Sequence, residues 1–481
     1  MKHGKGNRTA SPGNDRRSRS GIRMLFRRRG PSSLTLLYDE FQLPRMIRRS
    51  LNLMLLANLF GNLHGIICGG GTTAMVGLAN ELKAGDLAFG LINGIPQAAA
   101  LLQIPFSVLV NRTQGRKKYM LTVGLFSRAL WMLFGLIPLT VPTQPAWLPL
   151  WTLIFLLGIS SCCGSMINVC WLPWFSDLTP IRLRGRWFSF RDMLVAGVNL
   201  GFSLIVAWLL DTLPVYSRYI VVFALGGFLG MLDMICFGFC TEKYSDAPRK
   251  MRIGSLWKTI RQNRPFCRLV AMWTAWCFTS NLCAPYLGRY SVNEMGLSFM
   301  QMTIFGNAAA AVATVLVMTR WGKAMNVWGS RNVMLISALA TSLTDAFYLF
   351  SVPGSIWPVL LRNFCGAACW SGCNLAANSM QLSTSPDEAR PSYIAVFACI
   401  TSLAGVALGT LCGGTLLETW EGMGWFAGSL DRVKVLILLS TGLRLMVTAF
   451  LVPPLENDRD QTFSQMRAAV LGRFGRRKRI G

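Results

Sequence analysis

Charged residues are scarce in this sequence of 481 residues, and their scarcity is its first structural signal. Asp, Glu, Lys and Arg make up 14% of the chain, whereas soluble proteins average about 25%. Apolar runs are correspondingly long, as at 194–210, 219–240 and 333–353. A run of about 18 apolar residues forms a helix that can cross the hydrocarbon of a bilayer. The runs lack the alternation of barrel strands, so we predict membrane-spanning helices rather than a β-barrel.

Histidine is also rare, because the chain has only His3 and His64, and this excludes a histidine-rich metal site. Many of the 14 cysteines fall inside apolar runs, where a free cysteine behaves as a small hydrophobic residue, so no disulfide framework is expected. The phosphate-binding sequence Gly-x-x-x-x-Gly-Lys-Ser/Thr is missing, which argues against an ATP-driven pump in this chain. The H-E-x-x-H metalloprotease motif is missing as well. We therefore predict neither an enzyme nor a bound cofactor.

The formal net charge of +27 suggests nucleic-acid binding, but its distribution points to a membrane. Of the 48 Lys and Arg residues, 40 fall on one side of the predicted helices and 5 on the other. Short cytoplasmic loops carry such an excess, so both termini are predicted to lie in the cytoplasm, at an inner or plasma membrane. The basic tails lack the interleaved aromatic residues of a nucleic-acid stacking surface and are expected to contact anionic lipid. The twelve predicted spans are 51–80, 87–110, 119–140, 148–176, 192–210, 216–239, 269–288, 296–319, 332–351, 357–383, 392–417 and 433–455.

The chain repeats part of its pattern, which indicates two similar halves. The sequence Pro-x-x-x-Arg at 180–184 recurs at 386–390, and the same offset of 206 residues relates Asn168 to Asn374. A polar and basic stretch lies between the halves and is predicted to be a cytoplasmic linker. The expected organisation is a basic N-terminal segment (1–50), a first six-helix bundle (51–240), the linker (241–268), a second bundle (269–455) and a basic tail (456–481).

Two loops carry a related motif. Residues 107–118 read Ser-Val-Leu-Val-Asn-Arg-Thr-Gln-Gly-Arg-Lys-Lys, and residues 322–331 read Gly-Lys-Ala-Met-Asn-Val-Trp-Gly-Ser-Arg. With the Pro-x-x-x-Arg loops, they resemble the signature G-x-x-x-D-R-x-G-R-[RK] of the major facilitator superfamily, a likeness that covers about residues 50–455. Asn111 and Asn326 replace the acidic residue of the family, and a neutral hydrogen bond is roughly half as strong as a charge-assisted one, so a weaker conformational latch is expected. The gating residues that the resemblance implies are Asn111, Arg112, Arg116, Arg184, Asn326, Arg331 and Arg390.

Polar residues inside the predicted helices are the candidates for a solute site, because unpaired polar groups are costly in a bilayer. In the resembled fold, solute binds near the middle of the membrane between the halves, where Trp171 and Trp370 would offer stacking faces. For each single Asn or Ser, a hydrogen bond that joins two helices is the alternative. The residues predicted to bind solute are Asn62, His64, Asn168, Trp171, Asn199, Asn307, Arg362, Trp370, Ser371 and Asn374.

Three arginines, Arg128, Arg362 and Arg444, fall inside predicted helices. Asp233 lies deep in the same half as Arg128, and Asp345 lies deep in the same half as Arg444. Structural ion pairs and the binding of a substrate anion are therefore both open, and Arg362 is the best candidate for an anion. The predicted helices that would line the site contain no deep acid, which favours a neutral or anionic solute over a cation.

The resemblance implies an all-α integral membrane fold of twelve helices in two six-helix bundles. It also implies a secondary transporter, active as a monomer, that moves a small solute by alternating access. A non-transporting sensor or scaffold with the same fold is one alternative, because fold alone does not fix function. A membrane-embedded enzyme or lipid-handling protein is another. The glycines at 69–71 lie in an apolar helix and are expected to allow close packing or local unwinding.

Overall fold

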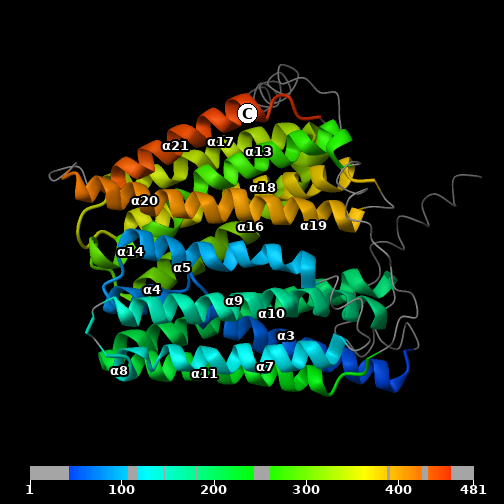
Figure 1. Cartoon of the computed structure of the whole chain (residues 1–481). Helices are drawn as coiled ribbons and strands as arrows, with labels where there is room; N and C mark the ends of the chain where they lie inside the picture. The colour runs from blue at the N-terminus through cyan, green and yellow to red at the C-terminus, as the bar shows by residue number, and fades with distance from the viewer. Residues whose placement is uncertain are drawn as a thin grey trace, which may run out of the picture.

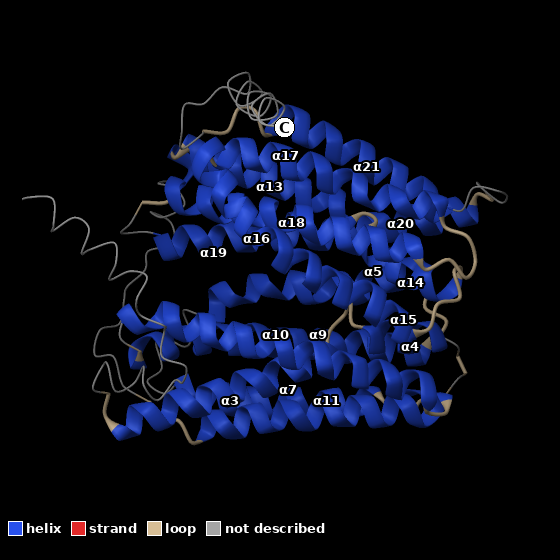
Figure 2. Ribbon diagram, turned by 180° about the vertical axis from the view of Figure 1, so that it is seen from behind, coloured by secondary structure: helices blue, strands red, loops and turns tan. Residues whose placement is uncertain are grey.

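The structure, a computed structural model, describes residues 43–106, 116–142, 144–145, 147–179, 181–242, 260–386, 390–424 and 432–456. Every regular element among them is a helix, and long helices run side by side through the molecule (Figure 1, Figure 2), which confirms the predicted all-α class. Nine of the described helices are long and apolar enough to cross a membrane. The helices over the expected spans 119–140, 269–288 and 357–383 fall short of this measure, so the number of twelve spans stays a prediction.

The first half consists of the helices that precede residue 240. They are α3 (Arg45–Ile67), α4 (Thr73–Glu81), α5 (Asp86–Ala98) with the 3₁₀ turn η1 (Ala99–Leu102), α7 (Arg116–Phe134), α8 (Ile137–Thr140), α9 (Leu148–Leu178), α10 (Ile181–Thr212) and α11 (Val215–Gly238). Helix α11 packs against both α3 and α7, and α9 packs against α5 and α7. Helix α3 begins at Arg45, several residues before the expected start, so its first turn is basic.

The second half follows residue 260. Its helices are α13 (Arg264–Asn281), α14 (Ala284–Asn293), α15 (Phe299–Met302), the π-helical η2 (Thr303–Ala308), α16 (Ala309–Trp328), α17 (Ser330–Thr344), the 3₁₀ turn η3 (Asp345–Phe350), α18 (Trp357–Thr384), α19 (Arg390–Ile400), the π-helical η4 (Thr401–Ala407), α20 (Leu408–Gly422) and α21 (Arg432–Leu451). Helix α18 packs between α16 and α17, and α13 packs against η4 and α21.

The first expected span, 51–80, is not one helix, because the chain leaves the helix between Ile67 and Thr73. A Cβ atom built on Gly70 would lie 2.2 Å from the carbonyl oxygen of Ile92 on α5, so only glycine allows this approach. Thr72 then starts the next helix, because its hydroxyl accepts a hydrogen bond from the amide of Met75 at 3.4 Å. The structure thus confirms the local unwinding predicted from the glycines.

The two halves meet through a small number of helices. Figure 1 shows the helices of the first half in the lower part of the view and most of those of the second half above them, with α5 near the boundary. Helix α5 packs against α20 and η4, and α10 packs against α15 and η2. A Cβ atom on Gly414 of α20 would lie 2.7 Å from the carbonyl oxygen of Asp86, which explains why glycine is needed at this crossing.

The hydrophobic core is shared by the halves at one end of the helices and divided at the other. One cluster of buried residues contains Phe89 and Leu78 of the first half together with Tyr286 and Leu417 of the second. A second cluster comes only from residues 43–240, and a third only from residues 260–455. These separate clusters lie at the helix ends that lead into the basic loops. The halves are therefore packed together at the end away from those loops.

Candidate functional site

A hollow of about 460 Å³ lies where the first half meets η2 and α16. Asn199 on α10 and Asn307 on η2, both predicted to bind solute, line it from opposite halves of the chain. Among the described residues, Asn199 Oδ1 is buried and has no hydrogen-bond partner. Buried polar atoms are normally paired, so this oxygen is a candidate partner for a polar solute in the hollow. We call this space the amide hollow, and its polar lining is Thr72, Thr73, Asn199, Ser203, Thr303 and Asn307.

Two local departures from the α-helix shape the amide hollow. The break between α3 and α4 places Thr72 and Thr73 on its wall. The π-helical turn η2 contains both Thr303 and Asn307, and such turns occur frequently at functional sites. The sequence predicted the first departure from its glycines, but it held no signal for the π-helical turn.

A second hollow, of about 370 Å³, lies within the second half between α13, α16, α17, α18 and α21. Arg362 and Trp370, both predicted site residues, line it. It shares a wall with the amide hollow, because Ala310 faces the second hollow while Asn307 and Ala311 face the first. We call this space the arginine hollow, and its polar and aromatic lining includes Trp276, Ser280, Asp345, Arg362, Trp370 and Arg444.

Asp345 binds two arginines in the arginine hollow. Its Oδ2 accepts a hydrogen bond from Arg444 Nη2 at 2.5 Å, and its Oδ1 accepts one from Arg362 Nε at 2.9 Å. The ion pair of Arg444 with Asp345 confirms the structural pairing considered from the sequence. The second pair was not anticipated, because the sequence indicated Arg362 as the best candidate for an anion and gave it no acid partner. Asp345 also lines the hollow. An acid therefore borders this space, although Asp345 does not belong to the helices that were expected to line the solute site.

The predicted site residues of the first helix do not reach either hollow. His64 is buried between α3 and α11, where its Nδ1 lies 2.8 Å from the carbonyl oxygen of Gly226. Its ring also meets the edge of Trp131. Asn62 donates a hydrogen bond to the carbonyl of Asn58 in its own helix at 2.7 Å. Nearby, Arg128 and Asp233 form the other expected ion pair, at 3.3 Å.

The four remaining predicted binding residues lie on α9 and α18, and two of them are exposed. Asn168 and Asn374 are both exposed and line neither hollow. Trp171 on α9 stacks on Phe175 and lies 5.7 Å from the guanidinium carbon of Arg191. Their part in solute binding stays a prediction, as does that of Ser371, which donates to the carbonyl of Ala368 at 2.8 Å.

Few of the predicted gating residues can be placed. Asn111 and Arg112 lie outside the described residues, and the side chains of Arg116, Arg184 and Arg390 do as well. The other two lie at the junction of α16 and α17. Asn326 is exposed, and Arg331 donates to the carbonyl of Pro453 at 3.5 Å.

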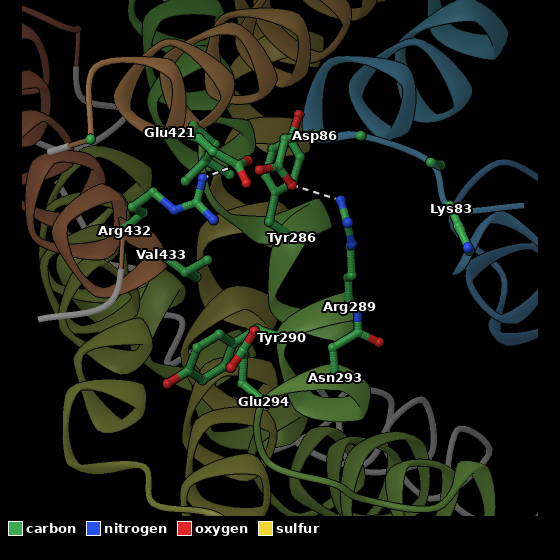
Figure 3. Close-up of a pocket in the computed structure, with 14 residues that line it drawn as sticks. Lys83, Asp86, Tyr286, Arg289, Tyr290, Asn293, Glu294, Glu421, Arg432 and Val433 are labelled. Carbon is green, nitrogen blue, oxygen red and sulfur yellow. Dashed lines mark hydrogen bonds and ion pairs between the residues drawn. The ribbon is translucent and has the colours of Figure 1, made fainter. Parts of the chain in front are cut away.

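A polar contact joins the halves at the end away from the basic loops. Arg289 on α14 pairs with Asp86 at the start of α5, with Nη1 and Oδ1 2.6 Å apart (Figure 3). Asp211 on α10 accepts hydrogen bonds from the backbone amides of Phe299, at 3.1 Å, and Met300, at 2.8 Å. We call this set the interhalf contact, and its members are Asn80, Asp86, Asp211, Arg289, Asn293 and Glu418.

The sequence held a signal at this end of the helices that the charge count did not use, and one of the three ion pairs concerned joins the halves. Three of the few cations on the sparse side have an acid partner there: Arg218 pairs with Glu81 and Arg432 pairs with Glu421, each at 2.6 Å, and Arg289 pairs with Asp86. Figure 3 shows the last two pairs around one space, of about 610 Å³. At the end of the helices that has no basic loops, an isolated charge in the sequence therefore indicates an ion pair. No cluster of His, Cys, Asp or Glu able to hold a metal occurs within the described ranges.

A family model described as Major Facilitator Superfamily matches residues 59–321 of the chain. The comparison with curated protein sequences gives no match. Among solved structures, the nucleoside transporter NupG superposes with a TM-score of 0.62 at 12% identity, covering 83% of this chain and 99% of that one. The xylose transporter XylE from E. coli gives 0.61 at 14% identity, covering 87% and 99%. The POT family transporter PepTSo gives 0.62 at 10% identity, covering 85% and 98%. At such identities the likeness concerns the fold alone.

Proposed function

The chain belongs to the major facilitator superfamily, and from this premise we propose that it is a secondary transporter that carries a small neutral or anionic solute by alternating access. The family model covers more than half of the sequence, and the chain is a multi-pass membrane protein of a family of transporters. The finer points, which are the class of solute and the cycle of conformations, rest on the geometry of the described residues.

The observation that carries the proposal is that Asn199 and Asn307 both line the amide hollow. One comes from each half of the chain, so a solute bound to both would be held by the two bodies that must rock about it. Amide side chains donate and accept hydrogen bonds without bringing charge. This lining suits a neutral polar solute or the polar part of an anion.

The division of the hydrophobic core supports one conformation of this cycle. The halves share a core at the end of the interhalf contact and have separate cores at the basic end. If the basic loops are cytoplasmic, this is an inward-facing state, closed on the outside. The structures of XylE and of a bacterial homologue of Spinster to which this chain is similar are described as inward open and inward-facing.

The proposed setting follows from the charge distribution. Both termini lie in the cytoplasm, the chain acts as a monomer in an inner or plasma membrane, and its basic tails lie on anionic lipid. Within the described residues, the only charged groups that line the two hollows are Asp345, Arg362 and Arg444. Two cations against one acid disfavour a cationic solute, which would need an acid of its own.

Uptake by the purified full chain in proteoliposomes tests the proposal. Labelled sugars, nucleosides, amino acids, peptides and organic anions would be offered in turn, with protein-free liposomes as the control. We expect saturable uptake of at least one solute and exchange of that solute when it is preloaded. Saturable binding without uptake of any solute would contradict the proposal and favour a sensor.

A further inference from the structure

The arginine hollow carries an unbalanced charge that the proposed function does not yet use. Asp345 is 2% exposed and is shared by Arg444, whose side chain is 3% exposed, and Arg362, whose side chain is 28% exposed. Two guanidinium groups against one carboxylate leave one net positive charge. A buried charge without a partner is costly, so the hollow is electrostatically suited to an anion.

The two arginines have different roles in this arrangement. Arg444 is enclosed and is already held by Asp345 Oδ2. Arg362 uses Nε for Asp345 and Nη1 for the side-chain oxygen of Asn363, at 3.1 Å. Its Nη2 takes part in neither of these bonds, and the side chain borders the hollow. Arg362 is therefore the cation that an incoming anion can reach.

The other walls of the hollow are aromatic and offer unused polar atoms. The rings of Trp276 and Trp370 are stacked, with centroids 5.3 Å apart and an interplanar angle of 21°. Trp370 also stacks on Trp273, with ring centroids 5.7 Å apart, and it is 38% exposed, so part of its ring surface is free for a further contact. Ser280 Oγ and Trp276 Nε1 are buried and, within the described part of the chain, have no hydrogen-bond partner.

We propose that the arginine hollow is a binding subsite for a small aromatic carboxylate. The carboxylate would bind Arg362, with Ser280 or the indole N–H of Trp276 as a further donor, and the ring would lie against Trp370. A volume of about 370 Å³ is at the lower end of the range for small-molecule pockets and suits a molecule with one ring. This inference rests on the proposed transport function, because the hollow adjoins the amide hollow through α16.

Equilibrium binding of radiolabelled benzoate to the full chain in lipid nanodiscs tests the subsite without requiring transport. Benzamide keeps the ring and loses the charge, and cyclohexanecarboxylate keeps the charge and loses the flat ring. We expect both to compete more weakly than benzoate, benzamide by about tenfold or more, because a charge-assisted bond to Arg362 is lost. Nanodiscs without protein measure the partition of each compound into lipid.

Variants then assign the binding to named residues. Arg362→Gln should weaken benzoate binding about tenfold and leave benzamide unchanged, while Arg320→Gln, at an exposed position on α16, should change neither. The first variant keeps the Asp345–Arg444 pair, and its thermal midpoint checks the fold. Trp370→Leu should lower the preference for benzoate over cyclohexanecarboxylate, and this arm tests the subsite even if Arg362→Gln does not fold.

The two proposals can fail separately. The subsite would be overturned by any of three results, even if another solute is transported. These are no binding of benzoate, equal affinity of benzoate for the unmodified chain and for Arg362→Gln, and equal affinity of benzoate and benzamide. Benzoate that binds with the expected dependence on Arg362 and Trp370, in a protein that transports nothing, would support the subsite and overturn the transporter.

Discussion

Arg289 Nη1 lies 2.6 Å from Asp86 Oδ1, and this ion pair joins α14 of the second half to the start of α5 in the first. Both side chains are partly exposed, at 24% and 17%, so the pair is worth about 0–1 kcal/mol. Such a small term still matters in a transporter, because its conformations differ by only a few kcal/mol. The pair is therefore suited to bias a conformational equilibrium rather than to hold the fold together.

We expect Asp86→Asn to open the interhalf contact more often. The loss of about 1 kcal/mol changes an equilibrium about fivefold. Asn80→Cys and Asn293→Cys report the change, because these side chains are hydrogen-bonded across the halves at 2.9 Å. Their cross-linking by a short bifunctional thiol reagent should become several-fold slower in Asp86→Asn.

The pair of Arg191 with Asp192 provides a control for this experiment. Its atoms are 2.7 Å apart and both residues lie in α10 of the first half, so Asp192→Asn should leave the rate of cross-linking unchanged. Single-cysteine versions show the background from native thiols. Equal rates in Asp86→Asn and in the unmodified chain would mean that the Asp86–Arg289 pair does not contribute to closure.

Ion pairs inside the membrane should behave differently, because removal of one partner leaves the other charge buried. Asp345→Asn leaves Arg444, 3% exposed, without a carboxylate, and breaking a buried pair costs about 3–5 kcal/mol. Asp233→Asn leaves Arg128, which is 15% exposed, so its cost should be smaller. Asp192→Asn, at an exposed position, should have almost no effect. Thermal unfolding of the purified variants measures this order, and a destabilisation equal to that of Asp192→Asn would contradict it for Asp345.

The sequence predicted well what depends on local pattern. Apolar runs located the helices, the glycines at 69–71 located the break before α4, and the two deep acids located the partners of Arg128 and Arg444. Each of these inferences follows from the cost of charge or of free backbone groups in a bilayer. The free-energy cost of a charge or of a free backbone group in the bilayer applies at each residue whatever the tertiary fold, so it can be estimated from the sequence alone.

The sequence could not predict what depends on the approach of distant segments. Arg362 was assigned to an anion, and the structure shows that it shares Asp345 with Arg444, because α18 and α21 both pack against η3, which contains Asp345. Asn199 and Asn307 were selected together with Asn168 and Asn374, yet only the first two line the amide hollow. Depth in the membrane can be estimated from sequence, but the direction of a side chain around its helix depends on packing.

The topology of the chain is tested independently of its activity. Both termini and the linker are predicted to be cytoplasmic, because the basic residues gather on their side. Reporter fusions after Gly254 and after Gly481 should therefore read as cytoplasmic. A fusion after Gly424, at the end of α20, should read as external. An external signal from the fusion after Gly254 or from the fusion after Gly481 would contradict the proposed orientation.

The relaxed latch is tested by restoring the acid that the family has. Asn326 lies at the end of α16, exposed, and Arg331 lies at the start of α17. Asn326→Asp adds a charge that can strengthen the hydrogen bonds of this junction, so we expect a shift in the conformational equilibrium. The cross-linking rate between Asn80→Cys and Asn293→Cys would report it, and Asn326→Gln, which brings no charge, is the control. Equal cross-linking rates in the chain with Asn326, in Asn326→Asp and in Asn326→Gln would contradict a role of this junction as a conformational latch.

The amide hollow offers the sharpest test of the solute site. Within the described residues, Asn199 Oδ1 is buried and has no hydrogen-bond partner, and such an atom costs about 1–3 kcal/mol of stability. Asn199→Ala should therefore leave thermal stability unchanged or raise it. It should also weaken the binding of the transported solute several-fold, because one neutral hydrogen bond contributes about 0.5–1.5 kcal/mol. Asn307→Ala should weaken binding by a similar factor, since both side chains line the same hollow.

Asn332→Ala separates a binding role from a structural role. Asn332 is buried on α17 and donates to the carbonyl of Trp328 at 2.9 Å, and it lines neither hollow. Its loss should lower stability and leave solute affinity intact, which is the reverse of the pattern for Asn199→Ala. Affinity would be measured by equilibrium binding, so that changes in the rate of the transport cycle do not enter. If Asn199→Ala and Asn307→Ala lower stability while the folded fraction binds solute normally, the amides join helices and the solute binds elsewhere.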